Sequence, residues 1–107
     1  MRENFRLFGA PHVAILTTDR SLGVYGAVDC GLYLATLMLA AQALGVGCIA
    51  QGALAFYPAF IRSHFGLPDD RRVVCAVSFG FADATHPVNS FRTSRAPLED
   101  VMTWVER

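Results

Sequence analysis

The sequence contains no lysine, so all nine of its basic residues are arginines, and nine acidic residues balance them. Only 17% of the residues are charged, and the net charge is zero. Such a chain has no strong field to attract nucleic acid or an anionic membrane surface. Its 53% hydrophobic content is too high for a disordered protein. We therefore expect residues 1–107 to form a single folded domain that binds neither nucleic acid nor membrane.

Paired cysteine motifs are also missing. The three cysteines, Cys30, Cys48 and Cys75, are odd in number, form no CxxC motif and lie in apolar runs. This pattern predicts reduced, buried thiols in a cytoplasmic protein. The three histidines are scattered without metal-ligand spacing, so we expect no metal site. Residues 1–6 are charged and no leader-like apolar segment follows directly.

One long uncharged run, residues 30–50, is long enough to span a membrane. Gln42, Gly45 and Gly47 interrupt it, and it lacks positive flanking residues. A helix that is apolar all round can equally be enclosed by protein. We expect this second arrangement, a buried central helix.

The pattern of apolar residues, glycines and prolines predicts alternating strands and helices. We expect strands at residues 12–18, 48–50 and 72–81, and helices at 24–44 and 58–65. The continuous apolar run at 72–81 predicts a central strand buried on both faces. Residues 101–105 (VMTWV) favour a strand by composition, although a short helix from Pro97 remains an alternative.

So few strands make a marginal sheet. A chain of this size buries only about 65% of the surface that its unfolded form exposes. The large apolar fraction therefore predicts a core that is shared with another chain, a cofactor or a further segment.

Three motifs, in order along nearly the whole chain, resemble one family. Residues 29–31 (DCG) with 37–47 (LMLAAQALGVG) resemble the central helix of the FMN-dependent nitroreductases. Residues 65–70 (FGLPDD) with 73–80 resemble the helix end and core strand that follow it. Residues 87–98 (PVNSFRTSRAPL) resemble the C-terminal segment that contacts the flavin phosphate.

The resemblance implies an α+β fold with three layers, α/β/α, in which helices cover both faces of a mixed, mainly antiparallel sheet. Members of the family are much longer, and their N-terminal half carries an Arg-Ser-Arg type motif for the FMN phosphate. No such motif occurs here. The chain therefore resembles the C-terminal half of the family fold.

The implied activity is that of an FMN-dependent NAD(P)H oxidoreductase. A nicotinamide would pass a hydride to flavin N5, and the reduced flavin would then reduce a nitroaromatic, a quinone or a similar small molecule. The flavin supplies the chemistry and the protein supplies binding and orientation. The alternative is a truncated, non-catalytic remnant, or a flavin-binding module that dimerises without turnover.

Four residues are candidates for cofactor binding by this resemblance. Gln51 and Gly52 align with the family's flavin loop, where backbone N–H groups can stabilise charge at N5 and glycine permits close approach. Several relatives carry Glu where Gln51 aligns. Arg92 and Arg95 align with basic residues that contact the phosphate, which arginine can bind in a bidentate manner. An ordinary turn and a solvated basic loop are the alternatives.

The resemblance also implies a homodimer. In the family the C-terminal extension crosses to the partner subunit and adds a strand to its sheet. We therefore expect residues 101–105 to be exchanged between subunits and the helix at 24–44 to lie in the interface.

Overall fold

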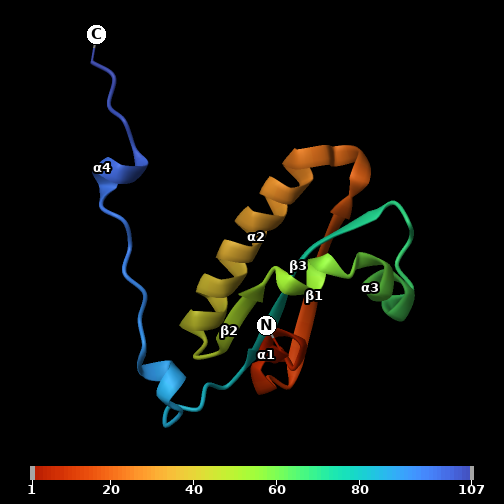
Figure 1. The fold of residues 1–107 in the computed structure, drawn as a ribbon, viewed down its shortest axis with the longest axis horizontal. Helices are drawn as coiled ribbons and strands as arrows, with labels where there is room; N and C mark the ends of the chain where they lie inside the picture. The colour runs from red at the N-terminus through yellow and green to blue at the C-terminus, as the bar shows by residue number, and fades with distance from the viewer. Residues whose placement is uncertain (1, 107) are drawn as a thin grey trace.

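The protein, described here by a computed structural model of residues 2–106, is built around a three-stranded antiparallel sheet (Figure 1). Its strands are β1 (His12–Asp19), β2 (Gly47–Gln51) and β3 (Arg71–Gly80), and its helices are α1 (Arg2–Phe5), α2 (Gly23–Ala43), α3 (Pro58–Phe65) and α4 (Leu98–Val101). The strand order is β1-β3-β2. The predicted strands and the two long helices are confirmed to within two residues at each end.

Strand β3 is the centre of the sheet. It pairs with β1 from His12 opposite Phe79 to Asp19 opposite Arg71, and with β2 from Gly47 to Gln51. A bulge interrupts the β1 pairing, because Leu16 lies opposite Cys75 whereas Thr17 lies opposite Val73. The middle of β3 is buried, as its continuous apolar run predicts.

Helices cover both faces of this sheet, which confirms the three-layer α+β arrangement. On one face, α2 packs through Leu34 and Leu37 on Leu16, Cys75 and Val77. The opposite face carries α3, α1 and the short 3₁₀ turn η3 (Ala53–Phe56), which together provide a second apolar cluster (Figure 1). That cluster contains Leu54, Ile61, Val73 and Ala76.

Helix α2 approaches β1 most closely at Gly26, its one buried residue. A Cβ atom on Gly26 would lie 3.0 Å from Leu22 Cβ and 3.1 Å from Thr18 Cγ2. The helix ends where Gly45 takes a left-handed conformation with φ of 72°. The N–H of Val46 then donates to the Ala41 carbonyl at 2.9 Å, which satisfies the helix end.

The rest of α2 is not enclosed within this chain, contrary to the expectation of a buried central helix. Val24, Tyr25, Leu32, Tyr33 and Leu39 are each more than 60% exposed. By length and composition alone, the helical segment at residues 20–43 could cross a membrane, a test that core helices of other proteins also pass. A single three-stranded sheet offers one face to this helix, and within residues 2–106 the other side of the helix is left exposed.

Beyond Gly80 the chain forms an arm, residues 81–106, that extends away from the sheet (Figure 1). It contains a 3₁₀ turn, η4 (Pro87–Ser90), and the single helical turn α4. The preferred prediction of a strand at residues 101–105 is wrong, and the alternative of a short helix after Pro97 is confirmed. A strand needs a neighbouring edge to pair with, and the arm meets none within the described part of the chain.

Candidate functional site

The candidate site lies where β2 ends and its chain turns into η3. Gln51, the last residue of β2, is only 1% exposed. Its side chain points away from α2, because Gln51 pairs with Ala76 in the register and shares the face of Ala76. The Gln51 side chain therefore packs in the protein interior, while its backbone, to which the prediction referred, leads into the loop.

Gly52 follows at the surface. It is exposed, and no heavy atom lies within 4 Å of the position that a Cβ would take. Its carbonyl accepts a hydrogen bond of 3.0 Å from the N–H of Ala55, which begins the η3 turn. The loop backbone at Gly52 is thus ordered by η3 and open to close approach by a planar ligand.

Arg92 and Arg95 lie in the exposed arm, close to each other in sequence. The Arg92 Nη1 atom donates to the carbonyls of Asn89 at 2.6 Å and Phe91 at 2.8 Å. Arg95 donates to Thr93 Oγ1 at 2.6 Å. Since the arm leaves the sheet, the structure joins the two arginines in one segment but does not bring them to the β2 loop of the same chain (Figure 1).

Sequence reasoning missed the polar partner of Gln51. Ser78, also 1% exposed, contacts the Gln51 carboxamide through its hydroxyl. The available signal was a lone hydroxyl within the apolar run of β3, because a buried polar group requires a partner.

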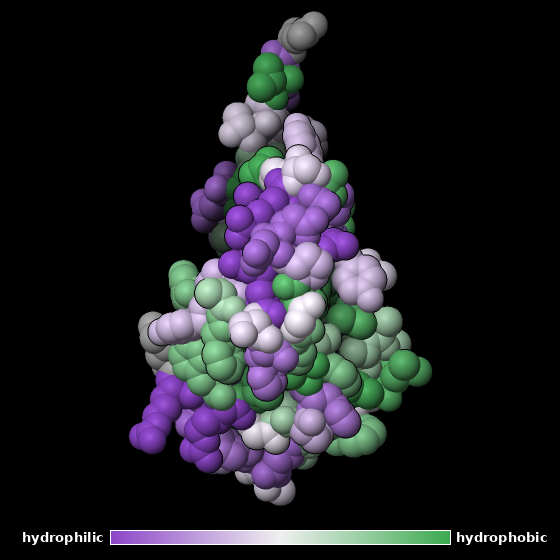
Figure 2. Space-filling view, turned by 90° about the vertical axis from the view of Figure 1, so that its right-hand side faces the viewer, coloured by the Kyte–Doolittle hydropathy of each residue, from purple (hydrophilic) through white to green (hydrophobic). Residues whose placement is uncertain are grey.

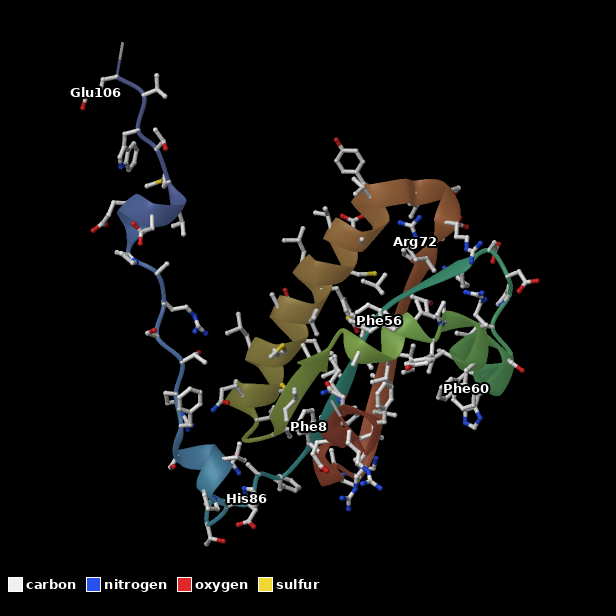
Figure 3. The ribbon with its side chains drawn as sticks, in the orientation of Figure 1. Phe8, Phe56, Phe60, Arg72, His86 and Glu106 are labelled. Carbon is white, nitrogen blue, oxygen red and sulfur yellow. The ribbon has the colours of Figure 1, made fainter. Side chains whose placement is uncertain are left out.

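An apolar cavity of about 490 Å³ lies on the same side of the sheet. Its lining residues are Phe5, Leu7, Leu54, Tyr57, Phe60 and Ile61. The rings of Phe5 and Tyr57 meet edge to face with centroids 5.4 Å apart. Phe60, which lines the cavity, and Phe56, which ends η3, are 65% and 77% exposed; Figure 3 labels both. Hydrophobic patches break the hydrophilic surface on this side of the molecule (Figure 2). This face, like the outer side of α2, carries apolar surface that the chain does not cover.

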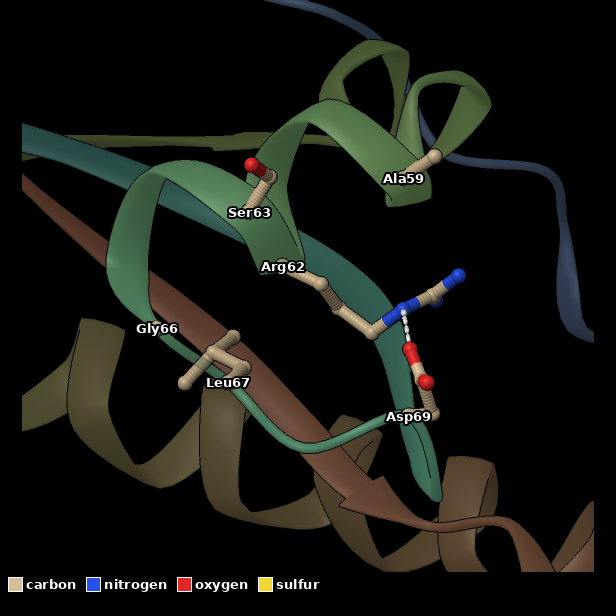
Figure 4. A pocket seen from close by; sticks show the side chains of 6 residues that line it. All are labelled: Ala59, Arg62, Ser63, Gly66, Leu67 and Asp69. Atoms are coloured by element: carbon tan, nitrogen blue, oxygen red, sulfur yellow. Dashed lines mark ion pairs between the residues drawn. The ribbon is translucent and has the colours of Figure 1, made fainter.

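A second cavity, of about 410 Å³, is lined by α3 and the loop before β3 (Figure 4). Arg62 is the basic residue among the described residues that line it, and its Nε atom lies 3.8 Å from Asp69 Oδ1. Arg62 also donates to the Arg71 carbonyl at 3.4 Å. The basic group of this cavity is thus already paired with a carboxylate, although the pair is long and the Asp69 side chain is fully exposed.

The titratable groups with shifted pKa values lie outside the β2 loop. Burial raises the pKa of the Cys75 thiol, and the neighbouring Cys30 adds to the effect. Hydrogen bonds from Ser21 lower the pKa of Asp19, and those from Thr85 lower the pKa of Asp83. Within residues 2–106, no group of three or more His, Cys, Asp or Glu side chains could hold a metal ion. The loop can thus supply backbone dipoles and shape, which suits a cofactor that brings its own chemistry.

Comparison with known proteins identifies the fold. A sequence model of the nitroreductase family matches residues 1–81. The nitroreductase NfnB of Mycolicibacterium smegmatis is 40% identical over 98 residues, which are 92% of this chain and 42% of that protein. The 4-nitrobenzoate reductase of Nocardioides sp. is 35% identical, over 97% of this chain and 42% of that protein.

Comparison with solved structures points to the same family as comparison of sequences. The FMN-dependent nitroreductase NfnB from Mycobacterium smegmatis, solved in complex with NADPH, has a TM-score of 0.88 and 38% identity over 97% of this chain. The FMN and NADPH-dependent nitroreductase NfnB from Sphigopyxis sp. strain HMH has a TM-score of 0.93 and 32% identity over 99% of this chain. This chain covers 46% and 48% of those two structures, so it spans less than half of the length of each. The chain belongs to the nitroreductase family and corresponds to the C-terminal part of the family fold.

Proposed function

We propose that this chain forms the C-terminal half of an FMN-dependent NAD(P)H oxidoreductase of nitroreductase type. The observation that carries the proposal is the open backbone of Gly52, which follows the buried end of β2 in a fold shared with FMN-dependent nitroreductases. The substrates would be NAD(P)H as hydride donor and a nitroaromatic, a quinone or a similar small molecule as acceptor. The thiols of the three cysteines are free, which suits a cytoplasmic protein.

The residues present fit FMN in two places. At Gly52 no heavy atom of the described residues beyond its chain neighbours lies within 4 Å of a Cβ position, which leaves room beside the loop, and a backbone N–H there would stabilise the charge that gathers at flavin N5 on reduction. Arg92 and Arg95 are exposed, and their present acceptors are carbonyl and hydroxyl oxygens of the same arm, which a phosphate can replace. When bound, FMN would exchange the hydride, while these residues hold and orient it.

We further propose a homodimer in which the arm of each chain crosses to the other. The chain exposes 8490 Å², whereas a compact protein of this mass exposes about 5,800 Å². The difference, roughly 2,600 Å², exceeds the share of each partner in a standard interface of about 800 Å², although part of it is the arm itself. The exposed side of α2 provides an apolar contact, and an arm that leaves its own sheet can deliver Arg92 and Arg95 to a second subunit.

A second candidate function is a flavin-binding or non-catalytic module without turnover. It is favoured by one observation, that the two pairs of candidate cofactor residues, in the β2 loop and in the arm, do not meet within the described part of the chain (Figure 1). Binding would then depend on a second copy or on a further segment.

A visible spectrum separates these functions. The purified protein is mixed with FMN, freed of excess flavin and treated anaerobically with NADH or NADPH. A yellow protein that bleaches supports the oxidoreductase, and a yellow protein that stays yellow supports the binding module. A colourless protein contradicts FMN binding by this chain alone.

A further inference from the structure

Two buried polar side chains meet beside the proposed flavin loop. Gln51 and Ser78 are each 1% exposed, and both lie on the face of the sheet opposite α2. Ser78 is two residues beyond Ala76 on β3, and Ala76 is the pairing partner of Gln51 on β2. The two side chains therefore project from neighbouring strands into the same layer.

The orientation of the Gln51 carboxamide follows from its neighbours. Gln51 Nε2 donates to the backbone carbonyl of Asn4 at 2.8 Å. A carbonyl can only accept, so the amide nitrogen must face Asn4 and the amide oxygen must face Ser78. The Ser78 hydroxyl is then the donor to Gln51 Oε1. No buried side-chain nitrogen or oxygen in the described part of the chain lacks a partner.

These two hydrogen bonds join three elements at one residue. Asn4 belongs to α1, Gln51 ends β2 and Ser78 lies in β3. Because Gln51 directly precedes Gly52, the fixed side chain restricts the backbone torsions that set the direction of the Gly52 peptide group. A buried polar network of this kind fixes one arrangement of its side chains only while every member has a hydrogen-bond partner.

We infer that Ser78 is a positioning residue for the flavin loop and acts through Gln51. This inference rests on the proposed function, in which the Gly52 backbone faces flavin N5. Ser78 itself is buried behind the loop, so its side chain would not touch the flavin. It holds the carboxamide of Gln51 so that the next peptide group keeps one orientation toward the flavin, while Asn4 fixes the other end of the same carboxamide.

The test compares Ser78→Ala, Ser78→Cys and the control Ser63→Ala. Ser63 is an exposed hydroxyl on α3 that takes no part in the network. FMN affinity is measured by fluorescence quenching, and the midpoint potential of the bound flavin by anaerobic titration. We expect Ser78→Ala to weaken FMN binding about tenfold, as for the loss of one buried hydrogen bond. Its potential should become more negative, because a misplaced donor stabilises the reduced flavin less.

A thiol fills the space of the hydroxyl but donates only weakly, so Ser78→Cys should lie between wild type and Ser78→Ala. Ser63→Ala should match wild type. If Ser78→Ala does not fold, Ser78→Cys decides: weaker FMN binding with a lowered potential supports the inference, and wild-type values overturn it. Equal affinity and potential in Ser78→Ala and Ser63→Ala likewise overturn it.

Hydrogen exchange measured by mass spectrometry, without flavin, keeps this inference separate from the proposed function. Peptides covering residues 51–56 should exchange about tenfold faster in Ser78→Ala than in wild type, with no change in Ser63→Ala. If wild type binds no FMN, the proposed function fails, and faster exchange still supports the coupling of Ser78 to the loop. Unchanged exchange overturns that coupling.

Discussion

Replacing Gly26 by alanine tests the closest contact between α2 and the sheet. The added methyl would meet Leu22 Cβ at 3.0 Å and Thr18 Cγ2 at 3.1 Å, and Thr18 is itself only 6% exposed. Contacts this short force the helix or the strand to shift. Inserting a methyl into such a packed position costs about 1–3 kcal/mol. Alanine also gains about 1 kcal/mol over glycine in a helix interior, which offsets part of that cost.

The same helix offers a matched control. Gly31 lies in α2, and no heavy atom lies within 4 Å of the position that an added methyl would take. Gly31→Ala should therefore raise the free energy of unfolding by up to about 1 kcal/mol. Gly26→Ala should lower the free energy of unfolding by up to about 2 kcal/mol, the packing cost less the helical gain, and so be about 1–3 kcal/mol less stable than Gly31→Ala. Urea denaturation followed by circular dichroism gives both values.

A second substitution identifies the cause. Thr18→Ala removes the side chain that the new methyl would strike, so it should cost less in the Gly26→Ala background than in wild type. If Gly26→Ala proves as stable as Gly31→Ala, the close packing of α2 on β1 is refuted.

Three further predictions concern the interface, the cofactor and pH. Leu32→Glu, on the exposed side of α2, should shift sedimentation toward monomer, whereas Ala59→Glu on α3 should not; equal behaviour contradicts the proposed interface. Arg95→Gln should weaken FMN binding about tenfold or more in fluorescence titration, whereas Arg6→Gln, at an exposed pair with Glu3, should leave it unchanged; parallel losses argue against a phosphate contact. The pKa of the buried Cys75 thiol is raised on folding, so its stabilising effect is complete below the unfolded value of about 8.5 and is lost as pH rises toward the folded value. The free energy of unfolding of wild type should therefore fall from pH 8 to 10 more steeply than that of Cys75→Ala, and equal slopes in urea titrations would contradict this.

Local sequence patterns were sufficient to predict the longer helices and the strands of the sheet. Pro58 at the start and Gly66 at the end delimit α3, and Gly66 takes the left-handed conformation with φ of 62°. The continuous apolar run of β3 predicted the central position that the strand occupies. These features depend on a few neighbouring residues, so they can be predicted from a single sequence.

The site was harder to predict, because its contacts join distant parts of the chain. Gln51 and Asn4 are 47 positions apart, and no local pattern shows that the carboxamide is buried between α1 and β3. The prediction of a strand in the arm was wrong for a related reason. Residues 101–105 have the composition of a strand, but strand formation depends on pairing with an edge, and the arm pairs with neither β1 nor β2, the edge strands of the described sheet.

The bulge in β3 has a consequence for insertions and deletions. Side chains in a strand alternate between faces, and the extra residue Val74 interrupts that alternation: Val73 packs with the α3 side, whereas Val74 and Cys75 pack with the α2 side. Deleting Val74 would restore strict alternation with Val73, Cys75 and Ala76 each on the face it occupies now, and it would place Val73 and Cys75 opposite Thr17 and Leu16 in an unbroken ladder. Both the Leu54 cluster and the α2 cluster would then keep their side chains. A single-codon deletion of Val74 should thus be tolerated far better than a deletion of Ala76, which would turn one half of β3 over relative to the other, and this makes the bulge a site where a divergent relative can lose a residue without a change in the register of the sheet.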